Sequence, residues 1–424
     1  MVIFDNGKMN TKSILRFSAT GSVDDGKSTL IGRLLFDSDS VFTEQLKEVE
    51  SVSARKGFEN PDLSLFTDGL KEEREQGITI DVAYRYFSTS KRKFILADTP
   101  GHLKYLRNMV TGVSNSDLSF ILIDAEKGIS EQTRRHTFLA HMLRIPFILV
   151  CVNKMDSVKY DEAVYEKIVR EFKLFSSVLN IQNINFIPLS ALKGDNVVEK
   201  SNHLSWYTGP TLLNYLETIP IYVENNTPEA RFPVQGVFVS DSPHESEHTF
   251  FAGRVAGGVF QVGDHVWLSP SLKQSKIQSI LTYDGKRKQA SAGESVLIRL
   301  EDDSVLKRGD IIFTGKRTPE SKQVIDVMIC WFSETSLESG KKYILRQSAS
   351  ESEAVISEVK YKIEISSFEK NTGAKELLTN DIGLISIRTT YPLFFDSYSS
   401  NKITGSIILI DPETNETAGV GMIA

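Results

Sequence analysis

The sequence has few cysteines, no long apolar run and no excess of basic residues. Cys151 and Cys330 are the only two cysteines in 424 residues, so we expect reduced structural thiols and a cytoplasmic protein. The longest apolar stretches, such as residues 145–152, have the length of buried strands and fall short of the ~20 residues that cross a bilayer. The net charge is −6, without the basic stripe that nucleic-acid binding favours. A membrane-spanning chain and a nucleic-acid partner are therefore not expected.

The first half of the chain alternates short apolar runs with helical patterns. The runs are unbroken, as in strands that are buried on both faces of a parallel sheet. They occupy residues 14–20, 92–98, 118–124, 147–153 and 185–190. Helical spacing lies between them, for example over residues 162–175. This order predicts a doubly wound, mostly parallel α/β domain.

Two regions have a different character. Residues 37–76 carry many charges and weak periodicity, which indicates a long surface loop or a mobile element. From about residue 223, short β-rich runs alternate with Gly, Asp and Ser, as in antiparallel barrels. A linker is expected at residues 318–323. The predicted domains are an α/β domain (1–222) and two small antiparallel β-barrels (223–319 and 320–424).

The stretch "GSVDDGKST" (21–29) fits the phosphate-loop pattern G-x-x-x-x-G-K-[ST] between a strand and a helix. In that setting, backbone N–H groups and the helix N-terminus face an anion. The predicted phosphate-binding residues are Gly21, Ser22, Val23, Asp24, Asp25, Gly26, Lys27, Ser28 and Thr29. Because amides and Lys27 hold the phosphates, we expect the Asp24 and Asp25 side chains to point outward into solvent.

Two further stretches predict magnesium binding and phosphoryl chemistry. "ADTPGH" (97–102) supplies Asp98 for Mg²⁺ and Gly101, whose N–H can approach the γ-phosphate. "EREQGITID" (73–81) supplies Thr79, which would join Ser28 and Asp98 around the metal on a loop that responds to the γ-phosphate. We predict that Lys27 and Thr79 act in catalysis and that His102 orients the attacking water. The alternative for His102 is a hydrogen-bonded structural histidine.

The choice of base rests on "NKMD" (153–156) and "SALKG" (190–194). The Asp156 carboxylate can accept two N–H donors from guanine, which adenine does not offer, and such a site discriminates strongly. Asn153 would contact the other polar edge of the base and tie loops together, and the Lys154 stem would pack over the base plane. Ser190, Ala191 and Leu192 are placed near the guanine 6-oxo group. The predicted ligands are therefore GTP and Mg²⁺.

These motifs resemble the translation-factor class of GTPases over essentially the whole chain. "GITI", "DTPGH" and "NKMD" are shared by that class. "SVDDGKSTLIGRLLFDS" and "KRKFILADTPGHLKYLRNM" are more specific, and resemble the family of large GTPase subunits of bacterial sulfate adenylyltransferase (ATP sulfurylase). Ser22 and Asp25 stand where elongation factors typically carry histidines. "HLKY" (102–105) departs from the family pattern, which tends to have polar residues there.

The resemblance implies a mechanism and a partner. A separate catalytic small subunit is expected to make adenylyl sulfate and pyrophosphate from ATP and sulfate, and GTP hydrolysis on this chain would drive that nucleotidyltransferase reaction. The sequence contains one phosphate-loop pattern, so the fused kinase domain of some relatives is not expected. The alternatives are a translation elongation or termination factor that binds tRNA or the ribosome, and a module that binds GTP without turnover.

Overall fold

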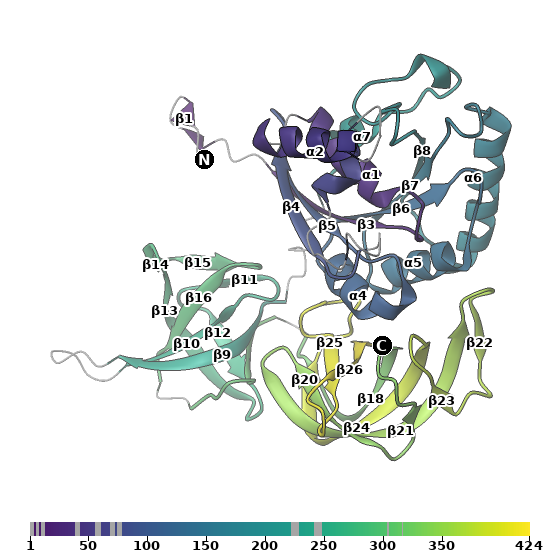
Figure 1. Cartoon of the computed structure of the whole chain (residues 1–424). Helices are drawn as coiled ribbons and strands as arrows, with labels where there is room; N and C mark the ends of the chain where they lie inside the picture. The colour runs from purple at the N-terminus through teal and green to yellow at the C-terminus, as the bar shows by residue number, and fades with distance from the viewer. Residues whose placement is uncertain are drawn as a thin grey trace. The chain divides into compact units, whose positions relative to one another are not determined.

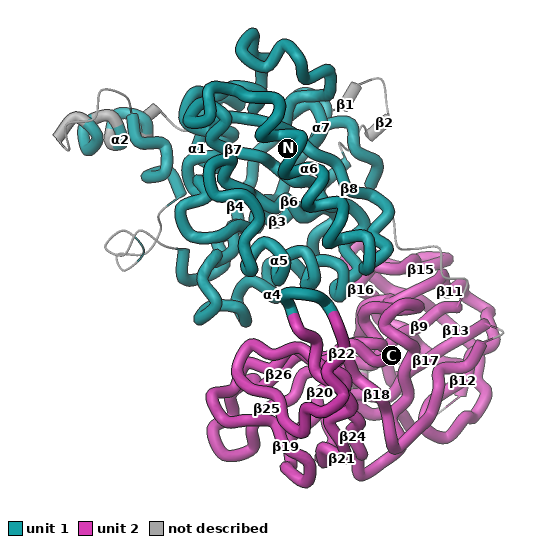
Figure 2. The backbone as a smooth tube through the Cα atoms, turned by 90° about the vertical axis from the view of Figure 1, so that its right-hand side faces the viewer, with its two compact units in different colours: residues 1–222, 365–368 teal, residues 223–364, 369–424 magenta. Residues whose placement is uncertain are grey.

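The computed structural model describes residues 4–5, 8–9, 13–38, 43–55, 61–67, 73, 79–221, 229–240, 248–302, 305–315 and 317–424. The chain divides into two units, residues 1–222 with 365–368 and residues 223–364 with 369–424 (Figure 2). The predicted boundary at residue 222 lies outside the described residues. The division of the second part into two domains stays a prediction.

A six-stranded sheet forms the centre of the first unit. In spatial order its strands are β4 (Ala83–Ser88), β5 (Lys93–Asp98), β3 (Ile14–Thr20), β6 (Leu118–Asp124), β7 (Phe147–Asn153) and β8 (Ile184–Pro188). All pairs are parallel except β4–β5. The predicted mostly parallel sheet is thus confirmed. The edge strand β4 is not among the predicted strands, because its exposed residues interrupt any apolar run.

Helices cover both faces of this sheet. The helices of this unit are α1 (Lys27–Asp37), α2 (Thr43–Arg55), α4 (Leu106–Ser114), α5 (Glu131–Met142), α6 (Glu162–Ser176) and α7 (Leu212–Thr218), with 3-10 turns η1 (Leu63–Phe66), η2 (Leu103–Tyr105), η3 (Ser177–Leu179) and η4 (Asn202–Leu204). Figure 1 shows α1 and α7 on one face and α4 and α5 on the other. Leu15 and Phe17 of β3 share a buried core with Leu30 of α1 and Leu212 of α7. This packing fixes where α1 begins, directly after the phosphate loop.

The loop expected over residues 37–76 is wrong for the part that forms α2 and η1. Leu46 and Val49 are spaced as one helical face, and Val49 is buried. Charged residues surround these positions, so the apolar stripe is narrow and the periodicity is weak. Residues 39–42, 56–60, 68–72 and 74–78 of this stretch lie outside the described residues.

The second unit contains two closed antiparallel barrels. The first has strands β9 (Arg231–Ser240), β10 (His248–Arg254), β12 (His265–Leu268), β13 (Lys273–Thr282), β16 (Ser295–Leu300) and β17 (Ile311–Phe313), with β14 (Gly285–Arg287) added to β13. The barrel closes because β12 pairs with both β13 and β17. Two short strands, β11 (Val259–Gln261) and β15 (Gln289–Ser291), pair beside it. Its core includes Phe232, Phe251 and Phe260.

The second barrel repeats this design with longer strands. They are β18 (Glu320–Trp331), β20 (Lys342–Gln347), β21 (Ser350–Glu364), β24 (Ile382–Phe395), β25 (Ser406–Ile410) and β26 (Thr417–Ile423), with β22 (Glu369–Asn371) on β21 and a separate pair, β19 (Leu337–Glu338) and β23 (Glu376–Leu377). Pairing of β20 with both β21 and β25 closes it. Because β18 begins at Glu320, residues 320–323 of the linker predicted over 318–323 belong to this strand.

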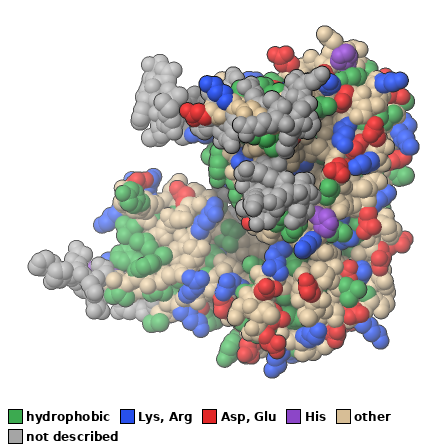
Figure 3. All heavy atoms as spheres, in the orientation of Figure 1, with side chains coloured by type: hydrophobic (Ala, Val, Ile, Leu, Met, Phe, Trp, Pro, Cys, Tyr) green, Lys and Arg blue, Asp and Glu red, His purple; other side chains and the backbone are tan. Residues whose placement is uncertain are grey.

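Several expectations from composition can be compared with the structure. Cys151 and Cys330 are buried and are not joined in a disulfide, which confirms the expected structural thiols. The parts of the chain that the structure describes contain no helix long and apolar enough to cross a membrane. On the face in Figure 3, Lys and Arg side chains are interspersed with Asp and Glu. A short pair of strands, β1 (Phe4–Asp5) and β2 (Lys8–Met9), lies near the N-terminus.

Candidate nucleotide-binding site

The predicted phosphate residues meet at the carboxyl ends of the central strands, where open α/β sheets bind their ligands. A cavity of about 380 Å³ lies there. Its lining residues are Ser22, Val23, Asp24, Gly26, Lys27, Ser28, Thr29, Ser64, Thr79, Gly101 and Lys154. Of the predicted phosphate-binding residues, Gly21 and Asp25 do not line it. Residues from five separate segments, around positions 26, 64, 79, 101 and 154, are thus brought to one cavity.

Two glycines give the phosphate loop its shape. Gly26 has φ 89°, and a Cβ there would lie 2.4 Å from Nδ2 of Asn153. A Cβ on Gly101 would lie 2.3 Å from the carbonyl oxygen of Gly21. Real Cβ atoms do not approach other atoms so closely, so larger side chains would force these loops apart. Both positions therefore need glycine for close approach, and Gly26 also needs its backbone freedom.

The two aspartates of the loop behave differently. Asp24 is exposed, as expected. Asp25 is only 4% exposed, and its Oδ2 accepts a hydrogen bond of 2.8 Å from the Ser22 N–H. The expectation that both side chains point outward is therefore wrong for Asp25, because its carboxylate closes the loop on itself. Burial raises the Asp25 pKa to about 6, with a contribution from nearby Asp124, while the Ser22 hydrogen bond opposes the shift.

Lys27 lies at the centre of the predicted phosphate and magnesium residues. Its Nζ donates to Oγ1 of Thr79 at 2.7 Å and forms an ion pair with the buried carboxylate of Asp98. The Ser28 side chain belongs to the same cavity. Two hydroxyls and one carboxylate are oxygen ligands of the kind that Mg²⁺ prefers, with phosphate oxygens completing the shell. The donor set around Lys27 therefore fits the predicted metal.

His102 is exposed and does not line the cavity. Its Nδ1 accepts a hydrogen bond of 3.1 Å from the Lys104 N–H and caps the turn η2. This contact shows a structural role for one ring nitrogen, in line with the alternative raised from the sequence. Nε2 is the other nitrogen, and its predicted role in orienting water stays a prediction.

The base-recognition loops are joined by Asn153, at the end of β7. Its Nδ2 donates to the Asp25 carbonyl oxygen at 2.8 Å, and its Oδ1 accepts the Ala191 N–H at 2.9 Å. The predicted tie between loops is thus present. Ser190 is buried and its Oγ accepts the Lys193 N–H at 3.1 Å, so the side chain shapes its own loop. Leu192 is exposed.

Asp156 has an unusual polar atom. Within the described chain, its Oδ1 is buried and has no hydrogen-bond partner. A buried carboxylate oxygen without a donor is unfavourable unless a ligand supplies one. Guanine would supply N–H groups to this carboxylate, so the atom fits the predicted base.

Sequence reasoning missed Asp124, which lies at the end of β6. Lys154 has φ 61°, and its Nζ donates to Asp124 Oδ2 at 2.8 Å. Burial raises the Asp124 pKa, but hydrogen bonds from Lys154 and the Glu126 N–H outweigh it and hold the pKa below its ordinary value. A polar residue at the carboxyl end of a central parallel strand is the signal that points to such a residue.

Two side-chain contacts between loops were also not predicted. The Ser22 hydroxyl lies 2.9 Å from that of Ser130, the residue that caps α5. Tyr160, after the "NKMD" stretch, donates to Asp195 at 2.6 Å and so joins the two base loops. Ser130 carries a sequence signal, since a serine directly before an acidic first helical residue, here Glu131, is a preferred N-cap. The Tyr160–Asp195 contact has none, because a hydroxyl and a carboxylate 35 residues apart show no pattern.

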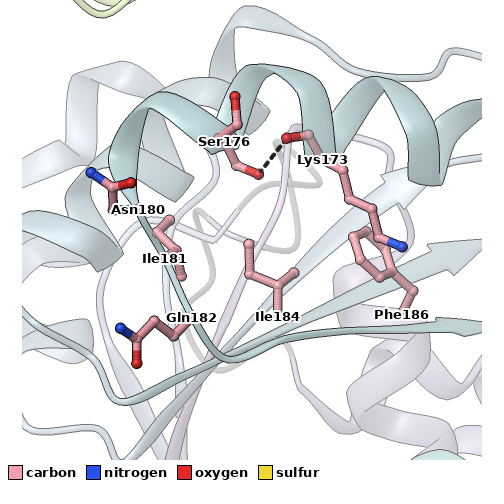
Figure 4. Close-up of a pocket in the computed structure, with 8 residues that line it drawn as sticks. Lys173, Ser176, Asn180, Ile181, Gln182, Ile184 and Phe186 are labelled. Atoms are coloured by element: carbon pink, nitrogen blue, oxygen red, sulfur yellow. Dashed lines mark hydrogen bonds between the residues drawn. The ribbon is translucent and has the colours of Figure 1, made fainter.

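A second cavity, of about 470 Å³, lies between the end of α6 and β8 (Figure 4). Its lining includes Lys173, Asn180, Gln182 and Phe186. The Lys173 ammonium lies 5.6 Å from the centre of the Phe186 ring. The cavity contains none of the motif residues, so it is not a candidate for the nucleotide.

Comparison with known families agrees with this geometry. Residues 12–223 match the elongation factor Tu GTP binding domain, and residues 324–424 match the family described as GTP-eEF1A C-terminal domain-like. The GTPase-like domain of S. cerevisiae Ski7, bound to GDP and inorganic phosphate, is 17% identical over 97% of each chain with a TM-score of 0.53. At that identity the likeness shows the fold alone.

Relatives that match almost the whole of this chain identify its family more closely. Sulfate adenylyltransferase subunit 1 of Bacteroides fragilis (strain YCH46) is 46% identical over 418 residues, which are 98% of this chain and 87% of that protein. The bifunctional enzyme CysN/CysC of Mycobacterium tuberculosis (strain CDC 1551 / Oshkosh) is 45% identical over 97% of this chain, which spans 67% of that protein's length. The chain therefore belongs to the sulfate adenylyltransferase subunit 1 family and carries a GTP-binding domain of the elongation factor Tu type.

Proposed function

We propose that this chain is the GTP-hydrolysing subunit of a sulfate adenylyltransferase. In this proposal a separate small subunit forms adenylyl sulfate and pyrophosphate from ATP and sulfate, an unfavourable reaction that GTP hydrolysis drives. The observation that carries the sulfate part is the 46% identity over 98% of the chain to a protein named for that activity. The GTP part is supported independently by the cavity and by Asp156.

The phosphates would bind to the loop amides and to Lys27. In the structure Lys27 contacts Thr79 and Asp98. When GTP binds with its metal, the Thr79 hydroxyl, the Asp98 carboxylate and the Ser28 hydroxyl would hold Mg²⁺. Lys27 would then contact the β- and γ-phosphates. Bound Mg²⁺ would neutralise charge on the phosphate oxygens. Thr79 and Lys27 thus both change partners when the nucleotide binds.

The guanine base would bind between the loops that Asn153 joins. Asp156 would accept its N–H groups through the carboxylate that contains the unpartnered oxygen. The loop of Ser190, Ala191 and Leu192 would face the 6-oxo group. The Lys154 stem would lie over the base, with its ammonium held by Asp124.

Hydrolysis requires a water in line with the γ-phosphate. His102 follows Gly101, which lines the cavity, and its Nδ1 is engaged by the Lys104 N–H. That contact fixes the ring and leaves Nε2 to orient the water. The proposed location is cytoplasmic, in keeping with two buried cysteines that form no disulfide.

Co-purification with an activity assay tests the proposal. The tagged chain, expressed in its host, is expected to bring down an adenylylating subunit. The complex should release pyrophosphate from ATP and sulfate faster with GTP than with a non-hydrolysable GTP analogue. Recovery of ribosomes or tRNA without an adenylylating subunit would overturn the proposal in favour of a translation factor.

A further inference from the structure

Arg33 joins helix α1 to the loop that the proposed function places against guanine. Its Nε donates to the Ala191 carbonyl oxygen at 3.2 Å, and its Nη2 donates to the Leu192 carbonyl oxygen at 2.8 Å. The third nitrogen, Nη1, lies 3.5 Å from Asp37 Oδ1, one helical turn along. One side of the guanidinium therefore contacts Asp37 of its own helix, and the other side donates to the base loop.

The position of this contact on α1 matters. The helix begins at Lys27, and Arg33 and Asp37 lie on the same face because they are four residues apart. Both side chains are half-buried, at 21% and 23% exposure. The loop turns at Gly194, which has φ 83° and whose added Cβ would lie 3.6 Å from both Arg33 and Asp37. The loop thus packs directly over the Arg33–Asp37 pair.

Hydrogen bonds to two successive carbonyls fix two peptide planes. A trans peptide points its C=O and the following N–H in opposite directions. When Arg33 holds the Ala191 carbonyl, it therefore turns the Leu192 N–H away from α1. The Ala191 N–H is held on the other side by Asn153 Oδ1. The planar fork of arginine suits this two-point contact, which a single ammonium cannot reproduce.

We propose that Arg33 is a positioning residue for base recognition, which orients the Leu192 backbone N–H toward the 6-oxo group of guanine. This inference rests on the proposed GTP-binding function. In this inference, recognition of the 6-oxo group depends on the backbone that Arg33 holds, while Asp156 accepts hydrogen bonds from the ring N–H and the 2-amino group. The two contributions can be separated with base analogues.

Binding of three nucleoside diphosphates to the full-length chain tests the inference. GDP carries both recognition features, inosine diphosphate lacks the 2-amino group, and 6-thioguanosine diphosphate replaces the 6-oxo group with sulfur. For Arg33→Gln, we expect the preference for GDP over the 6-thio analogue to fall by about tenfold, since a charge-assisted contact is lost. The preference for GDP over inosine diphosphate should stay within about twofold, because Asp156 is untouched.

Two further variants keep the test independent of folding. Arg33→Lys retains the charge and is expected to recover part of the lost preference. Arg92→Gln is the matched control, because Arg92 also donates to backbone carbonyls, those of Leu216 and Ile219, at 2.9 and 2.7 Å. Arg92→Gln should change the stability of the protein but neither the preference for GDP over the 6-thio analogue nor that for GDP over inosine diphosphate.

The outcomes separate this inference from the function on which it rests. If Arg33→Gln weakens all three ligands by one common factor, Arg33 is only structural and the inference is overturned. The same follows if the wild type does not distinguish GDP from the 6-thio analogue. If the wild type shows no preference for GDP over inosine diphosphate or ADP, the guanine assignment falls, and this inference with it.

Discussion

The phosphate half and the base half of the site are held together by different forces. Around Lys27, charged groups contact one another, with Asp98 and Thr79 as partners. Around Asn153, the loops are tied by hydrogen bonds to backbone groups, and one oxygen of Asp156 is buried without a partner in the described chain. In the proposed binding mode, the first half exchanges partners when a nucleotide binds, whereas the contacts around Asn153 are already formed. We therefore expect base selectivity to depend on fixed geometry and phosphate chemistry to depend on rearrangement.

The largest effect is expected in the preformed half. Asp156→Asn should weaken GTP binding by about 10³-fold and improve xanthosine triphosphate binding, because the amide reverses the hydrogen-bond polarity. Equilibrium binding of the two triphosphates measures the switch. Asp161→Asn is the matched control, since Asp161 is a nearby exposed carboxylate that caps α6 and asparagine also caps well. An unchanged preference in Asp156→Asn would sink the guanine assignment and the distinction between the halves.

A smaller effect is expected where the phosphate half acts on water. His102→Ala should slow GTP hydrolysis by about 10²-fold while GTP affinity changes little, as for a group that acts only in the transition state. Single-turnover hydrolysis and equilibrium binding separate the two quantities.

His102→Asn distinguishes catalysis from capping. Asparagine can accept the Lys104 N–H and so replace the cap, but it lacks the second ring nitrogen. We expect this variant to hydrolyse GTP as slowly as His102→Ala. Recovery of normal hydrolysis with asparagine would instead make His102 a structural residue.

The sequence predicts equally well which segments form the two halves of the site. The strands of the sheet follow from unbroken apolar runs, and the motifs place Lys27 and Asp98 together because Lys27 follows β3 and Asp98 ends the neighbouring strand β5. Thr79 precedes the edge strand β4, so its motif alone predicts its place beside Lys27. The base loops are located in the same way. Local patterns therefore predict which residues meet at the edge of a parallel sheet.

Contacts that depend on side-chain direction are less predictable. Arg33 lies on a helix face that the sequence presents as ordinary, and its carbonyl partners carry no side-chain signal. Helix α2 is hidden by the charges around its narrow apolar stripe. Asp25 is buried because its carboxylate bonds to a loop N–H three residues away, which solvation and charge alone would disfavour. Tertiary geometry decides each of these cases.

The last comparison concerns stability and Asp25, whose charge is buried in the phosphate half. Its folded pKa of about 6 exceeds the ordinary 3.8, so the folded state binds this proton more tightly than the unfolded state does. Stability therefore falls as pH rises from about 4 through about 6. Above that range the buried charge costs about 3 kcal/mol.

Asp25→Asn keeps an acceptor for the Ser22 N–H and removes the charge. In urea unfolding of the nucleotide-free protein, the variant should be more stable than the wild type at pH 8, and the gain should shrink towards pH 4. Asp24→Asn, at the exposed neighbour, should change stability by less than about 0.5 kcal/mol at either pH. If Asp25→Asn instead destabilises the protein equally at both pH values, the carboxylate acts as a hydrogen-bond acceptor that the amide cannot replace. The hydrogen bond from the Ser22 N–H would then stabilise the phosphate loop, as hydrogen bonds to backbone groups stabilise the base loops.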